Sequence, residues 1–276
     1  MTGALGGRVA IVTGGGWNIG RATSVAFARA GAAVVVAGRR SEPLEETVGL
    51  IEAAGGRGLA VPTDVTDWAA TEALVARATE HFGPVDVLAA LAGGGGGYEP
   101  VDAIEPEWWE HVIRINLVGT FHAVRAVLPG MRAANRGSIV TCTGGGAWFP
   151  MVGVHATAYA TAKAGICRFT DQLAVELMDT PIRVNCLQPG LTWDEKKLAA
   201  VAAEEARTGQ PDPARAENHP PEDGAELALF LASDASLPLH GRSVSVDEDW
   251  WQDAGRRERV QADLHSCCLR RMEPLA

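Results

Sequence analysis

The sequence lacks the segments that mark membrane and secreted proteins. None of the apolar runs in its 276 residues approaches the roughly 18 uninterrupted residues that a membrane-spanning helix requires. The amino terminus, Met-Thr-Gly-Ala-Leu-Gly-Gly-Arg, has no charged and then apolar segment of the kind that directs secretion. These absences predict a cytoplasmic protein without a membrane partner.

Positive charge is also scarce. The chain carries 24 Lys and Arg against 34 Asp and Glu, which gives a formal net charge of −10. Its basic residues never run longer than a pair such as Arg39-Arg40. Because nucleic acids and anionic membranes bind basic faces, the sequence argues against both partners. We expect small molecules instead.

Cysteines are few and widely spread. The five cysteines include no Cys-x-x-Cys pair, and Cys267 and Cys268 are too close for an ordinary disulfide. We therefore expect reduced thiols and no metal site. Hydrophobic residues make up 47% of the chain, which is ample for a sizeable core.

Short apolar runs rich in Val, Ile and Ala alternate with segments of helical period. This pattern is typical of repeated β-α units whose strands are buried on both faces. Helices are expected at Gly20–Ala30, Pro43–Ala54 and Trp68–Phe82. Strands are expected at Val9–Thr13, Ala33–Ala37, Gly58–Val61, Val85–Leu91, Ser138–Cys142, Arg183–Leu187 and Ser243–Val246. The sequence thus predicts a Rossmann-type, doubly wound α/β sheet of about seven parallel strands.

We expect one domain over residues 1–250 and a tail over residues 251–276. For the tail, the sequence leaves open packing on a neighbouring subunit or disorder. Within the domain, residues 191–221 alternate Ala with Glu and then contain four prolines. That composition indicates a surface segment, which we expect to form a lid over the substrate.

A glycine-rich turn follows the first predicted strand. The run Thr-Gly-Gly-Gly-Trp-Asn-Ile-Gly, residues 13–20, leads into a helix expected to start near Arg21. Glycines let the backbone approach a pyrophosphate, and a helix amino terminus supplies free N–H donors. The turn therefore favours dinucleotide binding over a purely structural role.

Tyr159, one of only two tyrosines, stands four residues before Lys163 in the run Tyr-Ala-Thr-Ala-Lys. On a helix, residues four apart share one face and can reach one substrate. Together with the glycine turn, this pair resembles the short-chain dehydrogenase/reductase family, whose turn reads Thr-Gly-x-x-x-Gly-x-Gly. The resemblance covers roughly residues 5–247, with the family's motifs in their usual order.

The resemblance implies the catalytic roles. Tyr159 would exchange a proton with the substrate oxygen while hydride passes between the substrate carbon and a nicotinamide. Lys163 would lower the pKa of Tyr159 and bind the nicotinamide ribose. Asn116 would hold a water in the proton relay; its alternative is a mid-helix residue bonded to a local carbonyl.

The resemblance also implies the cofactor contacts. Arg39 and Arg40 stand where an NAD-binding member has an acidic residue that binds the ribose 2′-hydroxyl. Arginine suits a 2′-phosphate instead, so NADP(H) is favoured over NAD(H). The alternative is that both arginines lie on a solvated loop and bind no cofactor. Asp64 would receive the adenine amino group, with Val65 beside the ring, unless Asp64 caps the helix that begins near Asp67. The other expected contacts are Gly14, Gly16, Trp17, Asn18, Ile19, Gly20, Leu91, Ala92, Gly93, Tyr159, Lys163, Pro189, Gly190 and Thr192.

Two positions depart from the family pattern. Asn18 replaces a glycine of the turn, and asparagine is well able to take a positive φ there. The substrate-orienting serine is missing: alignment by strand gives Gly144, and spacing from Tyr159 gives Gly146. Losing a preorganised donor of this kind can cost about 10²–10³ in rate.

Neighbouring side chains are candidates to replace the serine. We expect Thr143 first and His155 second, with Cys142 as a weaker donor. The alternatives are an ordinary strand-end threonine and a surface histidine. Five aromatic residues could line a substrate pocket: Trp108, Trp109, Trp148, Phe149 and Trp193. Packing in the core or in an interface explains them equally well.

The sequence therefore predicts an NAD(P)H-dependent oxidoreductase in a homo-oligomer, a tetramer or a dimer. It would reduce a ketone or quinone, or oxidise the alcohol, of a medium-sized and partly aromatic substrate. The alternatives are a dehydratase or isomerase on the same fold, and a nucleotide-binding sensor or scaffold. The presence of both Tyr159 and Lys163 argues against a pure binder.

Overall fold

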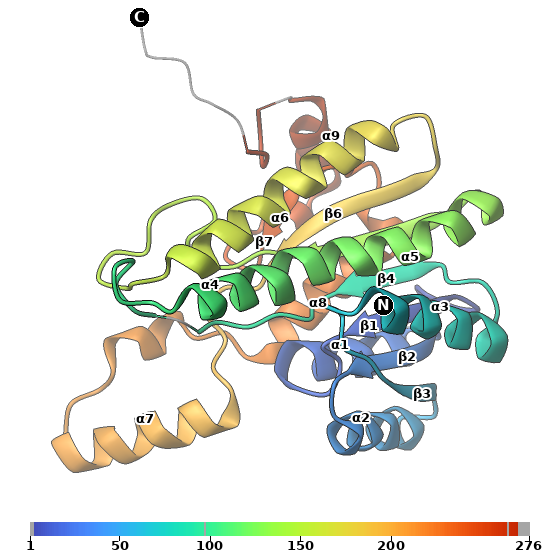
Figure 1. Ribbon diagram of the computed structural model, residues 1–276. Coiled ribbons are helices and arrows are strands. Elements are labelled where there is room, and N and C mark those ends of the chain that lie inside the picture. The colour runs from blue at the N-terminus through green and yellow to red at the C-terminus, as the bar shows by residue number, and fades with distance from the viewer. Residues whose placement is uncertain (1–2, 97, 264, 270–276) are drawn as a thin grey trace, which may run out of the picture.

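The computed structural model describes residues 3–96, 98–263 and 265–269. Its strands form one parallel sheet in the order β3-β2-β1-β4-β5-β6-β7 (Figure 1). They are β1 (Val9–Thr13), β2 (Ala33–Gly38), β3 (Arg57–Pro62), β4 (Val87–Ala90), β5 (Gly137–Cys142), β6 (Ile182–Gln188) and β7 (Ser243–Ser245). This confirms the predicted Rossmann-type fold, with each strand within two residues of its expected ends.

Helices cover both faces of the sheet. One face carries α1 (Asn18–Arg29), α2 (Ser41–Ala53) and α8 (Pro221–Ala232). The other face carries α3 (Trp68–Phe82), α5 (Gly119–Ala134) and α6 (Thr157–Glu176). A short helix, α4 (Pro106–Ile113), and a π-helical turn over Arg114–Val118 lead into α5.

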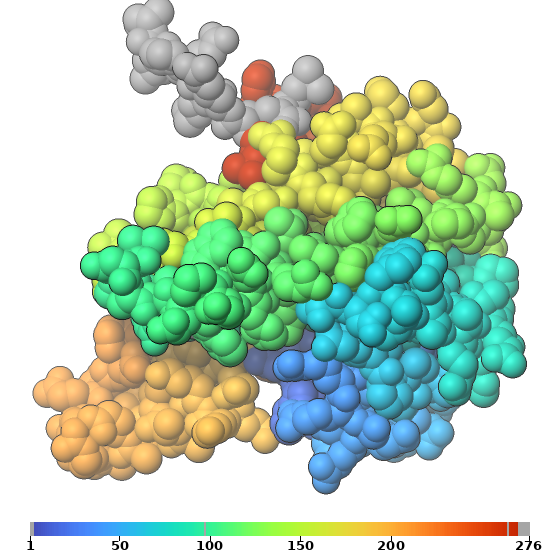
Figure 2. Space-filling model, viewed as in Figure 1, coloured from blue at the N-terminus to red at the C-terminus, as the bar shows by residue number. Residues whose placement is uncertain are grey.

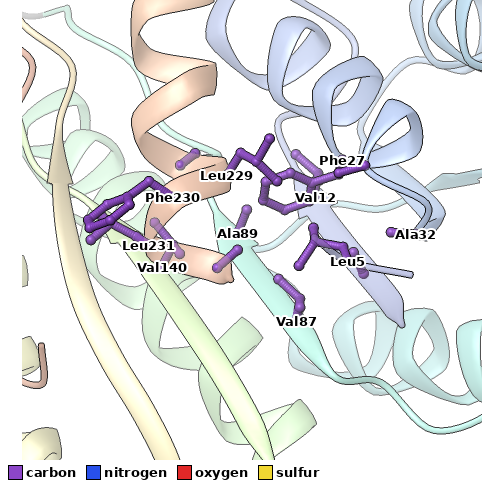
Figure 3. Packing of buried hydrophobic residues seen from close by; sticks show 14 of the residues in the cluster. Leu5, Val12, Phe27, Ala32, Val87, Ala89, Val140, Leu229, Phe230 and Leu231 are labelled. Carbon is purple, nitrogen blue, oxygen red and sulfur yellow. The ribbon is translucent and has the colours of Figure 1, made fainter. Parts of the chain in front are cut away.

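Alternation along the strands divides the apolar core between these two faces. In β1, Val12 belongs to the cluster under α1 and α8, and its neighbour Ile11 belongs to the cluster under α5. Figure 3 shows Leu229 of α8 above the strands that carry Val12 and Ala89. Burial of one such side chain stabilises the fold by roughly 1.5–3 kcal/mol. This two-sided burial explains why the strands read as continuous apolar runs.

The order of the strands places a crevice at the carboxyl ends of β1 and β4. From β1 the chain moves outward to β2 and β3, and then returns to lay β4 on the other side of β1. Connections leave β1 and β4 toward opposite faces, which opens a binding crevice in folds of this type. The Ala92 backbone N–H donates to Thr13 Oγ1 at 3.1 Å, which ties the two strand ends together.

The expected lid, residues 191–221, contains α7 (Glu195–Thr208), which stands away from the sheet in Figure 1. Both ends of this segment are fastened to one another. Leu191 forms a β-bridge with Asn218, and the His219 N–H donates to the Leu191 carbonyl at 2.7 Å. The segment is therefore a loop with joined ends that carries a protruding helix.

The first part of the expected tail packs on its own chain. The rings of Trp251 and Phe230 lie 4.9 Å apart, and Arg242 donates to the carbonyls of Val260 and Gln261 in or beside α9 (Ala254–Ala262). Residues 264 and 270–276 of the tail lie outside the described residues. None of the helices in the described part of the chain is long and apolar enough to cross a membrane.

Candidate active site

A cavity of about 1100 Å³ lies at the carboxyl ends of the central strands. In Figure 2 the surface is hollowed between the orange lid segment and the blue amino-terminal units, below green α4. Every residue that the sequence predicts to contact the cofactor lines this cavity. Thr143 also lines it, whereas Asn116 and His155 do not. The structure thus gathers motifs from nearly two hundred residues of chain into one site.

The glycine turn is packed so tightly that Gly20 has no room for a side chain. A Cβ on Gly20 would lie 2.1 Å from the Gly14 carbonyl oxygen, and Gly14 itself has a φ of +72°. Asn18 takes a φ of +44°, as its replacement of a glycine predicts. Because the first helical turn is built directly on this loop, α1 begins at Asn18 and not near Arg21. At Gly14, Gly16 and Gly20 the turn therefore presents backbone without side chains to the cavity.

The amino terminus of α1 has free hydrogen-bonding capacity. Its cap residue, Trp17, makes no side-chain hydrogen bond to the helix. Exposed N–H groups at a helix start, above a glycine cradle, suit a phosphate anion. The residues present therefore fit the diphosphate of a dinucleotide.

The far end of the cavity is basic and aromatic. The Trp17 ring lies between two guanidinium groups, at 5.3 Å from Arg21 and 5.1 Å from Arg40. Arg21 is engaged in an ion pair with Glu46 at 2.6 Å. Arg39 and Arg40 have no ion-pair partner among the described residues, so they can pair with an anionic ligand.

Asp64 lies beside these arginines and is ionised. Burial raises its pKa, but hydrogen bonds from the backbone and hydroxyl of Thr66 and the charge of Arg39 outweigh this, so the net pKa lies below the usual value. The alternative role as helix cap belongs to Asp67, whose carboxylate accepts from the Ala70 N–H at 3.2 Å. Asp64 therefore presents a charged acceptor to the cavity.

Tyr159 and Lys163 lie on the cavity side of α6. The Lys163 ammonium lies 5.5 Å from the centroid of the Tyr159 ring and donates to the Cys142 carbonyl at 3.1 Å. A Cβ on Gly144 would lie 2.4 Å from the Tyr159 hydroxyl, and one on Gly146 would collide with Ala160. The segment after β5 thus packs tightly on Tyr159 and the start of α6, because it carries no side chain at either glycine.

The pKa of Tyr159 lies above its usual value, and not below it as the sequence predicts. Burial raises the pKa of Tyr159 to about 12, and the neighbouring Cys142 thiol adds to this shift. The Lys163 ammonium is directed at a backbone carbonyl, which limits its stabilisation of a phenolate. Tyr159 is consequently a neutral phenol, prepared to give up a proton to a substrate oxygen.

Asn116 fastens the loop after β4. It is fully buried in the π-helical turn, where its amide donates to the carbonyls of Gly94 at 3.0 Å and Val112 at 2.9 Å. Its Oδ1 accepts from the Gly94 N–H at 3.2 Å. Asn116 therefore makes the predicted bond to a local carbonyl, that of Val112, and also contacts Gly94, which lines the cavity. A Cβ on Gly93 would lie 2.5 Å from this Oδ1, which requires glycine there.

The two candidates for replacing serine point elsewhere. The Thr143 hydroxyl donates to the Lys163 carbonyl at 3.0 Å and accepts from Cys167 Sγ at 3.2 Å. His155 is exposed and precedes α6, so its four-residue spacing from Tyr159 does not place it on the same helical face. Neither side chain forms a hydrogen bond with Tyr159 among the described residues.

Sequence reasoning missed His219. Its Nδ1 lies 2.9 Å from Asp223, and its Nε2 lies 2.9 Å from Asp247, so two carboxylates hold the ring across Gly190. The hydrogen bond to Asp223 is the largest cause of a raised His219 pKa, against a smaller opposing effect of burial. No sequence signal marks this contact, because it joins a residue before α8 to Asp223 in the first turn of α8 and to Asp247, which is 28 residues away and follows β7. Across the described ranges, no group of three or more His, Cys, Asp or Glu is placed to hold a metal ion.

The aromatic lining of the cavity differs from the expectation. Tyr98 lines it together with the expected Trp17 and Tyr159. The five residues predicted to form an aromatic substrate pocket do not: Trp108, Trp109, Trp148, Phe149 and Trp193. Trp193, for example, is buried in the lid segment. Tyr98 is therefore a second site residue that sequence reasoning missed, although the scarcity of tyrosine could have drawn attention to it.

Comparison with known proteins identifies the family of the chain. Residues 8–203 match the family model described as short chain dehydrogenase. A cis-4-hydroxycyclohexanecarboxylate dehydrogenase of Sinomonas cyclohexanicum is 36% identical, over 87% of this chain and 95% of that protein. A 2,3-dihydro-2,3-dihydroxybenzoate dehydrogenase of Bacillus subtilis is 32% identical, over 87% of this chain and 95% of that protein.

A solved structure shows the same fold. The crystal structure of a variant of actinorhodin polyketide ketoreductase with NADPH superposes with a TM-score of 0.78 and 28% identity. The match covers 89% of this chain and 97% of that chain. With its Rossmann sheet and its Tyr159–Lys163 pair, this chain belongs to the short-chain dehydrogenase/reductase family and is an NAD(P)-dependent oxidoreductase.

Proposed function

We propose that the protein transfers hydride between NADP(H) and a carbon of a six-membered ring, reducing a ring ketone or quinone or oxidising the ring alcohol. The observation that carries this proposal is the half-buried phenol of Tyr159, which lines the same cavity as the glycine turn and has a raised pKa. The names of the two curated relatives describe hydroxyl-bearing six-membered rings as substrates, which supports a substrate of this size and shape.

The chemistry divides between cofactor and protein. When bound, the nicotinamide supplies or accepts the hydride. Tyr159 donates its proton to the substrate oxygen during reduction and takes it back during oxidation. Lys163, with its ammonium 5.5 Å from the phenol ring centroid, holds positive charge beside the site where the phenolate forms. Asn116 holds the loop after β4 through Gly94, and in this proposal it would hold the water of the proton relay with Lys163.

We also propose that Gly144 occupies the position at which the family has its substrate-orienting serine. Its support is geometric, because the position lies directly against the Tyr159 hydroxyl. The chain would then act without that serine, and another group must orient the substrate oxygen.

NADP(H) is the proposed preferred cofactor. The support is the pair Arg39 and Arg40 at the cavity end, which have no acidic ion-pair partner among the described residues. Arg40 is held against the Trp17 ring, which orders its guanidinium before a ligand arrives. Guanidinium groups bind phosphate through two parallel hydrogen bonds, so this end suits a 2′-phosphate.

We also propose that residues 1–250 act as the catalytic domain, with 191–221 as its lid, and that the chain forms a homo-oligomer, a tetramer or a dimer. Large apolar side chains are exposed on the outer helices α5 and α6 and just beyond, at Phe121, Val175 and Met178. Such side chains on neighbouring helices suit contact with a second copy.

A turnover assay tests the proposed activity. Purified protein with NADPH should consume the reduced cofactor when given 4-oxocyclohexanecarboxylate, cyclohexanone or a substituted quinone. With NADP⁺ it should oxidise cis-4-hydroxycyclohexanecarboxylate. Tight NADPH binding without turnover of any ring ketone or alcohol would contradict the proposal and favour a nucleotide sensor. Substrate conversion without cofactor consumption would favour an isomerase or dehydratase.

A further inference from the structure

The second tyrosine of the chain faces the catalytic one. Tyr98 follows the glycine run after β4 and lines the same cavity as Tyr159. The two rings meet edge to face, with centroids 6.5 Å apart and an angle of 65° between planes. Both tyrosines of the 276-residue chain therefore lie at one site, from segments about sixty residues apart.

The glycine run is shaped around Tyr98. A Cβ on Gly95 would lie 2.0 Å from the Tyr98 hydroxyl, so only glycine leaves room for this ring. Gly96 has a φ of +147°, and a Cβ there would lie 3.3 Å from the Trp108 ring. These glycines let the loop fold back so that the phenol enters the cavity. These glycines thus make room for the Tyr98 ring, in addition to leaving space for a ribose.

The other hydroxyl groups of the cavity are already engaged. Thr63 donates to the Val61 carbonyl at 3.0 Å, and Thr192 donates to the Pro189 carbonyl at 3.3 Å. The Thr143 hydroxyl donates to a backbone carbonyl of α6. Only the two phenols have no hydrogen-bond partner among the described residues. They are the hydroxyl donors that remain for a ligand.

Partial burial favours the protonated form of the Tyr98 phenol. Burial is the largest cause of its raised pKa, and the neighbouring Tyr159 raises it further, whereas Lys163 opposes the shift. A neutral phenol is a hydrogen-bond donor. A carbonyl oxygen has two lone pairs, so it can accept from two phenols at once.

We propose that Tyr98 is a catalytic residue that donates a hydrogen bond to the substrate oxygen beside Tyr159. It would orient and polarise the carbonyl, a task that no side chain at Gly144 can perform. Tyr159 alone transfers the proton, and Tyr98 keeps its own. This inference rests on the proposed function, because it requires a carbonyl or alcohol oxygen as ligand.

Tyr98→Phe tests the inference, because it removes the hydroxyl and keeps the ring. With 4-oxocyclohexanecarboxylate and NADPH, kcat should fall by about 10²-fold, as for loss of one preorganised donor. The NADPH Kd and the melting temperature should not change, and a primary isotope effect from 4-deuterated NADPH should persist or rise. Val101→Ala, an exposed residue of the same loop without a hydroxyl, is the matched control and should keep the wild-type rate.

Fluorine spectroscopy gives a second test that uses the wild-type chain. Because the sequence has two tyrosines, 3-fluorotyrosine labelling gives two signals, which Tyr159→Phe assigns. Adding 4-oxocyclohexanecarboxylate to the NADP⁺ complex should shift both signals. A Tyr98 signal that does not move, or a Tyr98→Phe kcat within about twofold of wild type, overturns the inference. A wild-type protein without any turnover contradicts the proposed function itself, whereas an active one with an unaffected Tyr98→Phe contradicts only the role of Tyr98.

Discussion

The hydroxyl of Tyr159 occupies the space where a side chain on Gly144 would begin, since a Cβ there would lie 2.4 Å from the phenol oxygen. Real Cβ atoms do not approach this closely, so any other residue at this position must displace the catalytic phenol. Gly144→Ala should therefore lower kcat by at least about tenfold while leaving NADPH affinity unchanged.

The neighbouring glycine provides the control for this substitution. A Cβ on Gly145 meets only Met151, at 3.5 Å, which is an ordinary contact. Gly145→Ala should keep most of the activity. A Gly144→Ala enzyme with the wild-type kcat would show that Tyr159 does not work from the position described.

The contact between Gly20 and Gly14 predicts a loss of cofactor binding. Gly20→Ala would place a methyl group 2.1 Å from the Gly14 carbonyl oxygen and push the turn away from α1. NADPH affinity, measured by fluorescence titration, should fall by at least about tenfold, and the melting temperature should drop. Gly49→Ala in exposed α2, where nothing lies within 4 Å, should instead stabilise the protein by about 0.5–1 kcal/mol. Unchanged NADPH affinity in Gly20→Ala would argue against this turn as the diphosphate site.

The sequence predicts the fold well because the strands are buried on both faces. β1 has the expected bounds because its sequence is a short run of apolar and β-branched residues. α3 has the expected bounds because Asp67 caps its start and Gly83 follows its last residue. The turn at Asn18 was also predictable, because few residues other than glycine accept a positive φ.

The direction of individual side chains was not predictable from the sequence. The hydroxyl of Thr143 turns toward α6, and Tyr98 reaches the site through an irregular glycine loop with no period to interpret. His219 is held by carboxylates from two other segments. Such contacts depend on how loops meet at the sheet edge, which spacing along the chain does not record.

Arg40 should determine the preference of the protein for NADPH over NADH. Its guanidinium lies over Trp17 at the cavity end, without an acidic partner among the described residues. Arg40→Ala should weaken NADPH by about tenfold or more, the value of a charge-assisted hydrogen bond, and leave NADH nearly unchanged. Arg29→Ala, in the last turn of α1 and outside the cavity lining, is the control. An equal loss for both cofactors would contradict a 2′-phosphate contact.

The raised pKa of Tyr159 predicts opposite pH profiles for the two directions. Because burial raises this pKa to about 12, the phenol stays protonated through the neutral range. Ketone reduction, which uses the protonated form, should show no loss from Tyr159 ionisation as pH rises from about 7 to 10. Alcohol oxidation, which uses the phenolate, should rise about tenfold per pH unit over that range. An oxidation rate that is already level near neutral pH would show a phenol with a much lower pKa.

The most direct measurement is single-turnover hydride transfer by Tyr159→Phe, with the wild-type enzyme beside it, using NADPH and a ring ketone that the wild type reduces. The substitution removes one hydroxyl and keeps the buried ring, so NADPH should bind with unchanged affinity. If Tyr159 supplies the proton, the transfer rate should fall by at least about 10²–10³-fold. A Tyr159→Phe protein that reduces the ketone at the wild-type rate would contradict the proposed mechanism.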